Sequence, residues 1–202
     1  MPELLLASAS PRRRDILQNL GLRFRVIPAP EIDEAAIMVD KSIGPSDVAS
    51  RLSLEKANVI KLIPEEVALT ADTIVVINNE ILGKPKDNPE AKLFLDKLSG
   101  KRHEVITAIT LKKSNGKVFC GVETTGVYFR AMTKKEIEWY IASGEPFGKA
   151  GAYAIQGFGG LFIYRIEGCY FNVVGLPVFR LTQLFHEAGY DYMDFMDTVK
   201  AL

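Results

Sequence analysis

Two arginines follow a hydroxyl-rich turn near the start of the chain. Arg12 and Arg13 come directly after the run Ser8-Ala9-Ser10-Pro11, which an apolar strand over residues 4–7 precedes. Ser10 is a favoured N-cap and Pro11 suits the first helical position, so a helix is predicted from residue 11. A helix N-terminus favours anions, and guanidinium groups bind phosphate through paired hydrogen bonds. Both a phosphate-binding turn and a capped helix with solvated arginines fit this pattern.

Asp72 interrupts the strongly β-branched stretch over residues 67–77. A buried, unpaired carboxylate would be costly, so this strand is expected to open on a cleft at Asp72. There the side chain could bind a divalent metal ion or act as a general base on water. An edge strand with Asp72 facing solvent is the alternative.

Two lysines and an acidic loop could belong to the same site. Lys56 falls within the apolar stripe of a helix expected over residues 47–63, and Lys84 follows the hairpin arm over residues 80–82. Long lysine side chains often reach past apolar surface to water, but both ammonium groups could instead face one phosphate-lined cleft. The loop over residues 31–34 reads as solvated by itself. With Asp72, its Glu34 could complete a magnesium site.

Glycines are frequent over residues 148–160, a stretch that contains Gln156. Glycine allows the backbone to approach a ligand closely, and a glutamine amide offers both donors and an acceptor to the edge of a nucleobase. A flexible surface loop is the alternative, but the interleaved Tyr153, Ile155 and Phe158 argue against a free linker.

The elements around these residues predict a mixed α/β fold. The pattern indicates strands over residues 24–27, 67–77, 80–82, 104–111, 117–129, 161–166 and 170–174, and helices over residues 11–20, 47–63, 88–98, 134–142 and 177–188, with one more in the tail over 190–202. We expect one domain over residues 1–202, with a mixed twisted sheet, flanking helices and two lobes around a deep cleft.

Bulk properties exclude several classes of protein. The 202 residues carry 25 basic and 25 acidic side chains and no extended basic block, so nucleic-acid binding has no electrostatic support. No apolar stretch approaches the roughly 20 residues of a membrane helix. Cys120 and Cys169 lack zinc-site spacing and read as buried free thiols of a reducing compartment, which predicts a cytoplasmic protein. A P-loop motif is also missing from the sequence.

The segments together resemble the Maf family of nucleotide pyrophosphatases over residues 4–184. The resemblance rests on pieces that occur in the family's order: Ala7 to Arg13, Asp33-Glu34, Leu54-Glu55-Lys56-Ala57, Ala71-Asp72-Thr73, Gly83-Lys84-Pro85, Lys149 to Gly157, and Asn172 to Pro177. It implies a fold similar to that of inosine triphosphatases and cleavage of nucleoside triphosphates to a monophosphate and pyrophosphate. It also implies a divalent cation such as Mg²⁺ or Mn²⁺ and, often, a homodimer.

The resemblance also assigns roles to residues. Asp72 matches the proton acceptor, and Arg12, Thr73 and Gln156 match positions linked to substrate choice. Other cleft positions of the family are matched by Ser8, Arg13, Glu34, Lys56 and Lys84. Gln156, where a sister subgroup that acts on 7-methyl-GTP has glutamate, points to the subgroup that acts on dTTP and UTP. Because the family is also associated with inhibition of septum formation, a nucleotide-binding regulator without essential turnover is the alternative.

Overall fold

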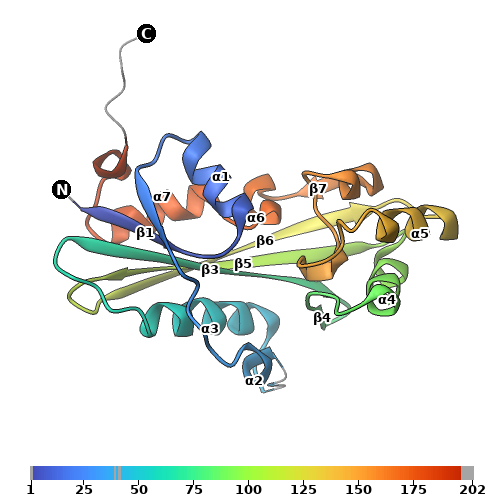
Figure 1. Cartoon of the computed structure of the whole chain (residues 1–202), viewed down its shortest axis with the longest axis horizontal. Coiled ribbons are helices and arrows are strands. Elements are labelled where there is room, and N and C mark those ends of the chain that lie inside the picture. The colour runs from blue at the N-terminus through green and yellow to red at the C-terminus, as the bar shows by residue number, and fades with distance from the viewer. Residues whose placement is uncertain (1, 39, 41, 197–202) are drawn as a thin grey trace, which may run out of the picture. The chain divides into compact units, whose positions relative to one another are not determined.

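Seven strands form one sheet in the computed structural model, which describes residues 2–38, 40 and 42–196 (Figure 1). The strands are β1 (Glu3–Ala7), β2 (Phe24–Ile27), β3 (Glu66–Ile77), β4 (Glu80–Leu82), β5 (Arg102–Lys113), β6 (Val118–Phe129) and β7 (Ile163–Glu167). The α-helices are α1 (Pro11–Asn19), α2 (Glu34–Met38), α3 (Pro45–Asn58), α4 (Asn88–Leu98), α5 (Lys134–Ala142), α6 (Tyr170–Val174) and α7 (Val178–Glu187), and the 3₁₀ turns are η1 (Ala150–Ala152), η2 (Phe158–Phe162) and η3 (Tyr192–Phe195). The strand order is β2-β1-β3-β5-β6-β7, with β4 paired to β3, so the predicted mixed α/β class is confirmed.

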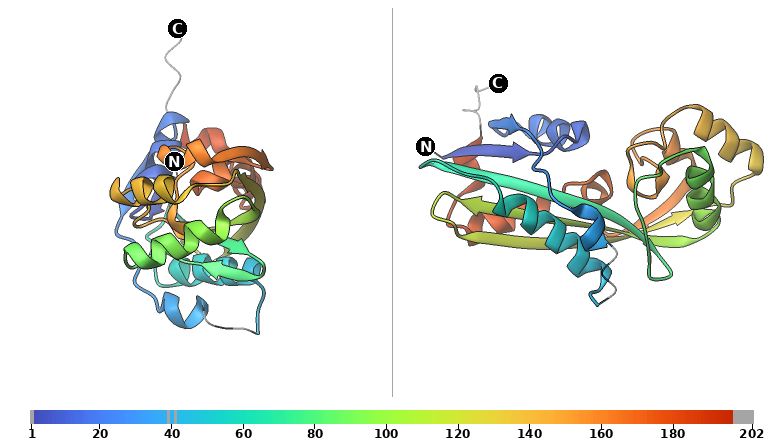
Figure 2. Two further views of the ribbon diagram at one scale, coloured as in Figure 1. Left: turned by 90° about the vertical axis from the view of Figure 1, so that its right-hand side faces the viewer. Right: turned by 60° about the horizontal axis from the view of Figure 1, so that its bottom comes forward.

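The chain divides into two compact units, the first made of residues 1–72, 107–122 and 175–202 and the second of residues 73–106 and 123–174. In the first unit, β1 lies between β2 and the first half of β3, parallel to both. Helices α1 and α7 cover one face of these strands and α3 covers the other (Figures 1 and 2). Leu17 of α1 and Leu52 of α3 are fully buried, which anchors both layers.

The path of the chain makes the end of β1 a topological switch point. From β1, the chain crosses one face through α1 to reach β2, and it crosses the opposite face through α3 to reach β3. In α/β proteins, ligands bind outside the carboxyl end of a strand at such a switch point. The end of β1, beside the middle of β3, is therefore the place in this sheet where a site is expected.

The second unit has its own apolar core. Helices α4 and α5 contribute Leu95 and Tyr140 to it, both fully buried, and β6 contributes Phe129. The predicted β3–β4 hairpin is confirmed: Asn78 and Asn79 both have positive φ, as a two-residue type I′ turn requires. The helix expected over residues 134–142 is present as α5, and a capping box between Thr133 and Glu136 begins it.

Several predicted elements differ from the structure. Glu34 begins the short helix α2 rather than lying in a loop, because the Asp33 carboxylate accepts a hydrogen bond from the backbone N–H of Ala36. Helix α3 ends at Asn58 rather than residue 63, because Lys112 of β5 donates to the carbonyls of Asn58 and Ile60 at its C-terminus.

The expected strand over residues 170–174 is the helix α6. Thr125 of β6 accepts a hydrogen bond from the backbone N–H of Cys169 and donates to its carbonyl, which fixes the chain where α6 begins. In the tail, residues 192–195 form η3, and residues 197–202 of the expected helix lie outside the described residues.

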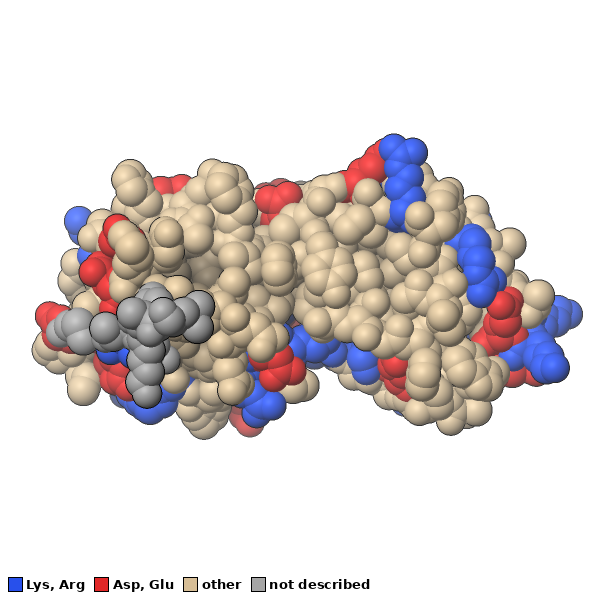
Figure 3. Space-filling model, turned by 90° about the horizontal axis from the view of Figure 1, so that it is seen from above, with Lys and Arg blue, Asp and Glu red and all other residues tan. Residues whose placement is uncertain are grey.

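Surface properties follow the composition. On the face drawn in Figure 3, basic and acidic side chains lie beside one another at the edges, as zero net charge predicts. Within the described ranges, helices long and apolar enough for a transmembrane span are not found. Both cysteines are free, but Cys120 is exposed and Cys169 half-buried, so the expected burial of both thiols is wrong.

Candidate active site

Polar residues lie where the pairing between β1 and β3 ends. The last pair in that register is Leu6 with Leu69, so Ser8 and Ala71 lie side by side two residues further on. Asp72 follows directly, on the half of β3 that extends past the end of β1. The residues that sequence analysis singled out at Ser8 and Asp72 thus meet at the switch point, which the parallel pairing alone places there.

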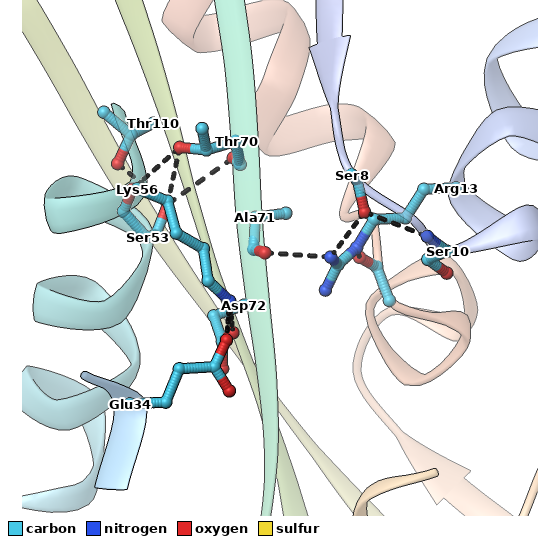
Figure 4. A network of polar contacts seen from close by, with 11 residues as sticks. Ser8, Ser10, Arg13, Glu34, Ser53, Lys56, Thr70, Ala71, Asp72 and Thr110 are labelled. Atoms are coloured by element: carbon cyan, nitrogen blue, oxygen red, sulfur yellow. Dashed lines mark hydrogen bonds and ion pairs between the residues drawn. The ribbon is translucent and has the colours of Figure 1, made fainter. Parts of the chain in front are cut away.

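Arg13 locks the turn between β1 and α1. Its Nη1 donates to the Ser8 hydroxyl at 3.1 Å and to the Ala71 carbonyl at 2.8 Å, and its Nε donates to the Gly175 carbonyl at 2.8 Å (Figure 4). Ser8 Oγ in turn accepts from the backbone N–H of Ser10 at 3.2 Å. One guanidinium therefore joins the turn, β3 and the approach to α7.

Burial and neighbouring charges act on the pKa of Arg13 in opposite directions. Burial lowers it to about 10, the charge of Arg12 adds to the lowering, and the charges of Asp72 and Glu34 raise it. At neutral pH the group stays protonated. The adjacent Arg12 is half-buried, and burial lowers its pKa as well. Two neighbouring guanidinium groups that burial deprives of water favour an anionic ligand.

Lys56 lies between two carboxylates. Its Nζ is 2.5 Å from Asp72 Oδ1 and 2.7 Å from Glu34 Oε1 (Figure 4). The side chains of Lys56 and Asp72 are 12% and 15% exposed, so the pair is largely shielded, whereas Glu34 at 41% reaches solvent. Lys56 does not extend past the apolar stripe to water. Its contacts with Glu34 and Asp72 match the other interpretation, in which the ammonium group faces a polar site.

Three buried hydroxyls fix α3, and hence Lys56, against the strands. Thr70 Oγ1 donates to the Ser53 carbonyl at 2.7 Å, and Ser53 Oγ donates to Thr110 Oγ1 at 2.9 Å. All three residues are fully buried. Ser53 precedes Lys56 by about one helical turn, so the same helix face carries the anchor and the ammonium group. Sequence analysis missed these residues, because serine and threonine in a helix or strand carry no signal of their own.

The other predicted residues belong to the second unit. Thr73 is half-buried, while Lys84 and Gln156 are exposed. Within that unit, the backbone N–H of Gly151 donates to the carbonyl of Gly83 at 3.0 Å, which ties the turn before Lys84 to the glycine-rich stretch. The structure thus brings Ser8, Arg13, Glu34, Lys56 and Asp72 together in the first unit. The contribution of the remaining residues stays a prediction.

The fold and the site define an α/β protein with a shielded, charged site at the switch point of its parallel strands. Residues 3–188 match the family model described as Maf-like protein. The chain therefore belongs to the Maf family, as the motifs predicted.

Curated relatives agree with this assignment. The chain is 48% identical to a dTTP/UTP pyrophosphatase of Carboxydothermus hydrogenoformans, over 93% of this chain and 100% of that protein. It is 42% identical to a dTTP/UTP pyrophosphatase of Symbiobacterium thermophilum, over 94% of this chain and 96% of that protein. Among solved structures, a nucleoside-triphosphatase/dITP/XTP pyrophosphatase from Mycobacterium abscessus is 15% identical, with a TM-score of 0.41 over 64% of this chain and 75% of its own.

Proposed function

We propose that this protein hydrolyses dTTP and UTP to the nucleoside monophosphate and pyrophosphate. The observation that carries the proposal is the ammonium group of Lys56 held between Asp72 and Glu34 at the switch point. A shielded carboxylate beside fixed positive charge suits water attack on a phosphate group. The names of the relatives support the substrate and the reaction.

In the proposed reaction, the Asp72 carboxylate takes a proton from water. The water oxygen forms a bond to phosphorus while an anhydride P–O bond breaks, and pyrophosphate leaves with the bonding electron pair. Arg12, Lys56 and the positive dipole end of α1 would neutralise the phosphates. Arg13 and Ser8 would keep the phosphate-binding turn in shape. This is catalysis by positioning and charge, without a covalent intermediate.

Residues of the second unit also match positions of the family's site. Lys84 would bind a phosphate group, while Thr73 and Gln156 would take part in substrate choice. The resemblance to the family further supports a cytoplasmic homodimer. Its ligand would be the nucleotide, and neither nucleic acid nor a membrane would be a partner.

A divalent cation such as Mg²⁺ or Mn²⁺ fits the residues present. Glu34 and Asp72 converge on the same ammonium group, so two oxygen donors from separate elements share one location. Clusters of three or more histidine, cysteine or acidic residues are not found in the described part of the chain. Magnesium needs no such cluster, because it is commonly held by one or two carboxylates together with substrate phosphates and water. The bound ion would supply positive charge for the phosphate oxygens.

The Asp72→Asn variant tests the mechanism. Asparagine keeps the shape but cannot accept the proton, so we expect kcat for dTTP to fall by about a hundredfold or more. The matched control is Asp96→Asn, which breaks an exposed pair with Lys92 on α4 and should leave kcat unchanged. Pyrophosphate release would be measured for dTTP, UTP, CTP, GTP and 7-methyl-GTP. Near-normal turnover by Asp72→Asn would refute its role as base.

The same assay separates an enzyme from a regulator. Release of pyrophosphate from dTTP and UTP by the unmodified protein supports the proposal. Tight binding of these nucleotides without pyrophosphate release, in the presence of Mg²⁺ or Mn²⁺, would favour the alternative function in control of cell division.

A further inference from the structure

One carboxylate and one phenol bind both ends of the segment that carries Gln156. Glu145 follows α5, and the chain then passes through η1 and η2 to β7 (Figure 1). Glu145 Oε2 accepts from the backbone N–H of Phe158 and Oε1 from that of Gly159, each at 2.9 Å. The Tyr140 hydroxyl donates to Glu145 Oε1 at 2.8 Å and accepts from the backbone N–H of Ala154 at 3.3 Å. Residues 154 and 158–159 are thus held, with the exposed Gln156 between them.

The glycines of this segment show how closely it fits the pair. A Cβ at Gly157 would collide with Glu145 Oε2, and a Cβ at Gly159 would lie 2.7 Å from the Ala154 carbonyl oxygen and 2.8 Å from the Tyr140 hydroxyl. Neither space admits a larger residue without movement of the carboxylate, the phenol or the Ala154 backbone. Glycine at these positions therefore serves approach to Glu145 and Tyr140, not flexibility.

The ionisation states keep the arrangement fixed at neutral pH. Burial raises the pKa of Glu145, but hydrogen bonds from Gly159, Phe158 and Tyr140 outweigh burial and leave the pKa below its usual value. Burial and the contact with Glu145 raise the pKa of Tyr140. Glu145 therefore remains an acceptor and the fully buried Tyr140 remains a donor.

We infer that Glu145 and Tyr140 are positioning residues for base selection, which act by holding residues 154–159 in the conformation that presents Gln156. The inference rests on the proposed role of Gln156 in substrate choice. It separates two functions: charge chemistry rests on residues of the first unit, whereas the preference among bases depends on a half-buried carboxylate and a buried phenol of the second unit, neither of which touches substrate.

Glu145→Gln tests the inference, because the amide keeps the size but places an N–H₂ group against a backbone N–H donor. We expect KM for dTTP to rise about tenfold with kcat within about twofold, and the preference for dTTP over GTP to fall. Amide hydrogen exchange at residues 158 and 159 should accelerate about tenfold. The matched control is Glu136→Gln, which makes the same carboxylate-to-amide change at the other end of α5, where it removes the charge that faces Arg130, and should change neither the preference nor this exchange.

Tyr140→Phe is a second variant that retains the ring, and we expect the same rise in KM from it. Gln156→Ala distinguishes the inference from the function it rests on. If Gln156→Ala leaves the dTTP to GTP preference unchanged, the base-selecting role of Gln156 fails. If it changes that preference while Glu145→Gln and Tyr140→Phe do not, the positioning role fails. Additive losses in the Glu145→Gln, Gln156→Ala double variant would also overturn it, because residues that act through one another are not additive.

Discussion

His103 makes a quantitative prediction about stability at acid pH. The residue is 1% exposed in the core of the second unit, with its Nε2 2.8 Å from the Tyr153 hydroxyl and its ring edge-to-face against Phe129. Its Nδ1 has no hydrogen-bond partner among the described residues. Burial, followed by the nearby charge of Arg102, lowers the pKa of His103 from 6.5 to about 3. The folded protein thus keeps this imidazole neutral throughout the physiological range.

The sign of the effect follows from linkage. Above pH 6.5 the imidazole is neutral in both folded and unfolded chains and contributes no pH dependence. Below pH 6.5 the unfolded chain binds a proton that the folded chain does not, so the free energy of unfolding decreases as the pH is lowered, down to about pH 3. Each pH unit in this window costs about 1.4 kcal/mol, so acidification from neutral to about pH 5 removes ~2 kcal/mol through His103 alone.

The assay is urea unfolding at neutral pH and at about pH 5, followed by fluorescence of Trp139. This tryptophan is the single one in the sequence and lies in the same unit as His103. We expect His103→Gln to lack ~2 kcal/mol of the acid destabilisation that the unmodified protein shows. His186→Gln, at an exposed histidine of α7, is the matched control and should retain the unmodified pH dependence. Equal losses in the unmodified protein and His103→Gln would refute the reasoning, as would a His103 titration near pH 6.5 by NMR.

Two further predictions concern the framework of the charged site. In Arg13→Lys, one ammonium group cannot reach the Ser8 hydroxyl and the Ala71 and Gly175 carbonyls together, so we expect the free energy of unfolding to fall by about 2 kcal/mol and KM for dTTP to rise. Arg14→Lys, at the exposed neighbour, is the control, and equal urea midpoints for the two variants would contradict the structural role of Arg13. Ser53→Ala removes the buried donor to Thr110 Oγ1, so we expect the free energy of unfolding to fall by about 1 to 2 kcal/mol. We also expect a lower kcat, because the same helix carries Lys56. Ser50→Ala, which loses an exposed hydroxyl on α3, is the control and should change neither the free energy of unfolding nor kcat.

The elements that depend on local chemistry could be predicted from the sequence. Ser10-Pro11 and Gly21 delimit α1, the Asn78-Asn79 pair defines the hairpin, and Thr133 with Glu136 begins α5. Each signal acts through residues within a few positions of one another, so no knowledge of the fold is needed. The sequence likewise predicts a polar site at Asp72, because a buried carboxylate within a β-branched strand requires a partner.

Tertiary contacts decided where local signals were weak or misleading. Residues 170–174 have strand-like composition, but Thr125 binds the chain at Cys169 and the segment is helical. The end of α3 depends on Lys112, 54 residues beyond the Asn58 carbonyl that it binds. In both cases the deciding group comes from a distant strand, and a local pattern carries no information about it.

The charged residues themselves were determined by the sequence, but their partners were not. The motif predicts that Arg13 belongs to a phosphate site, but it does not predict the hydrogen bond from Arg13 to the Gly175 carbonyl, which joins positions 162 residues apart. From the sequence, a side chain that reaches past the apolar stripe to water is the default for Lys56, and only its contacts with Asp72 and Glu34 show that it faces the polar site. Sequence specifies which side chains are costly to bury alone. The fold specifies which distant group compensates that cost, because only chain closure brings the two within hydrogen-bond distance.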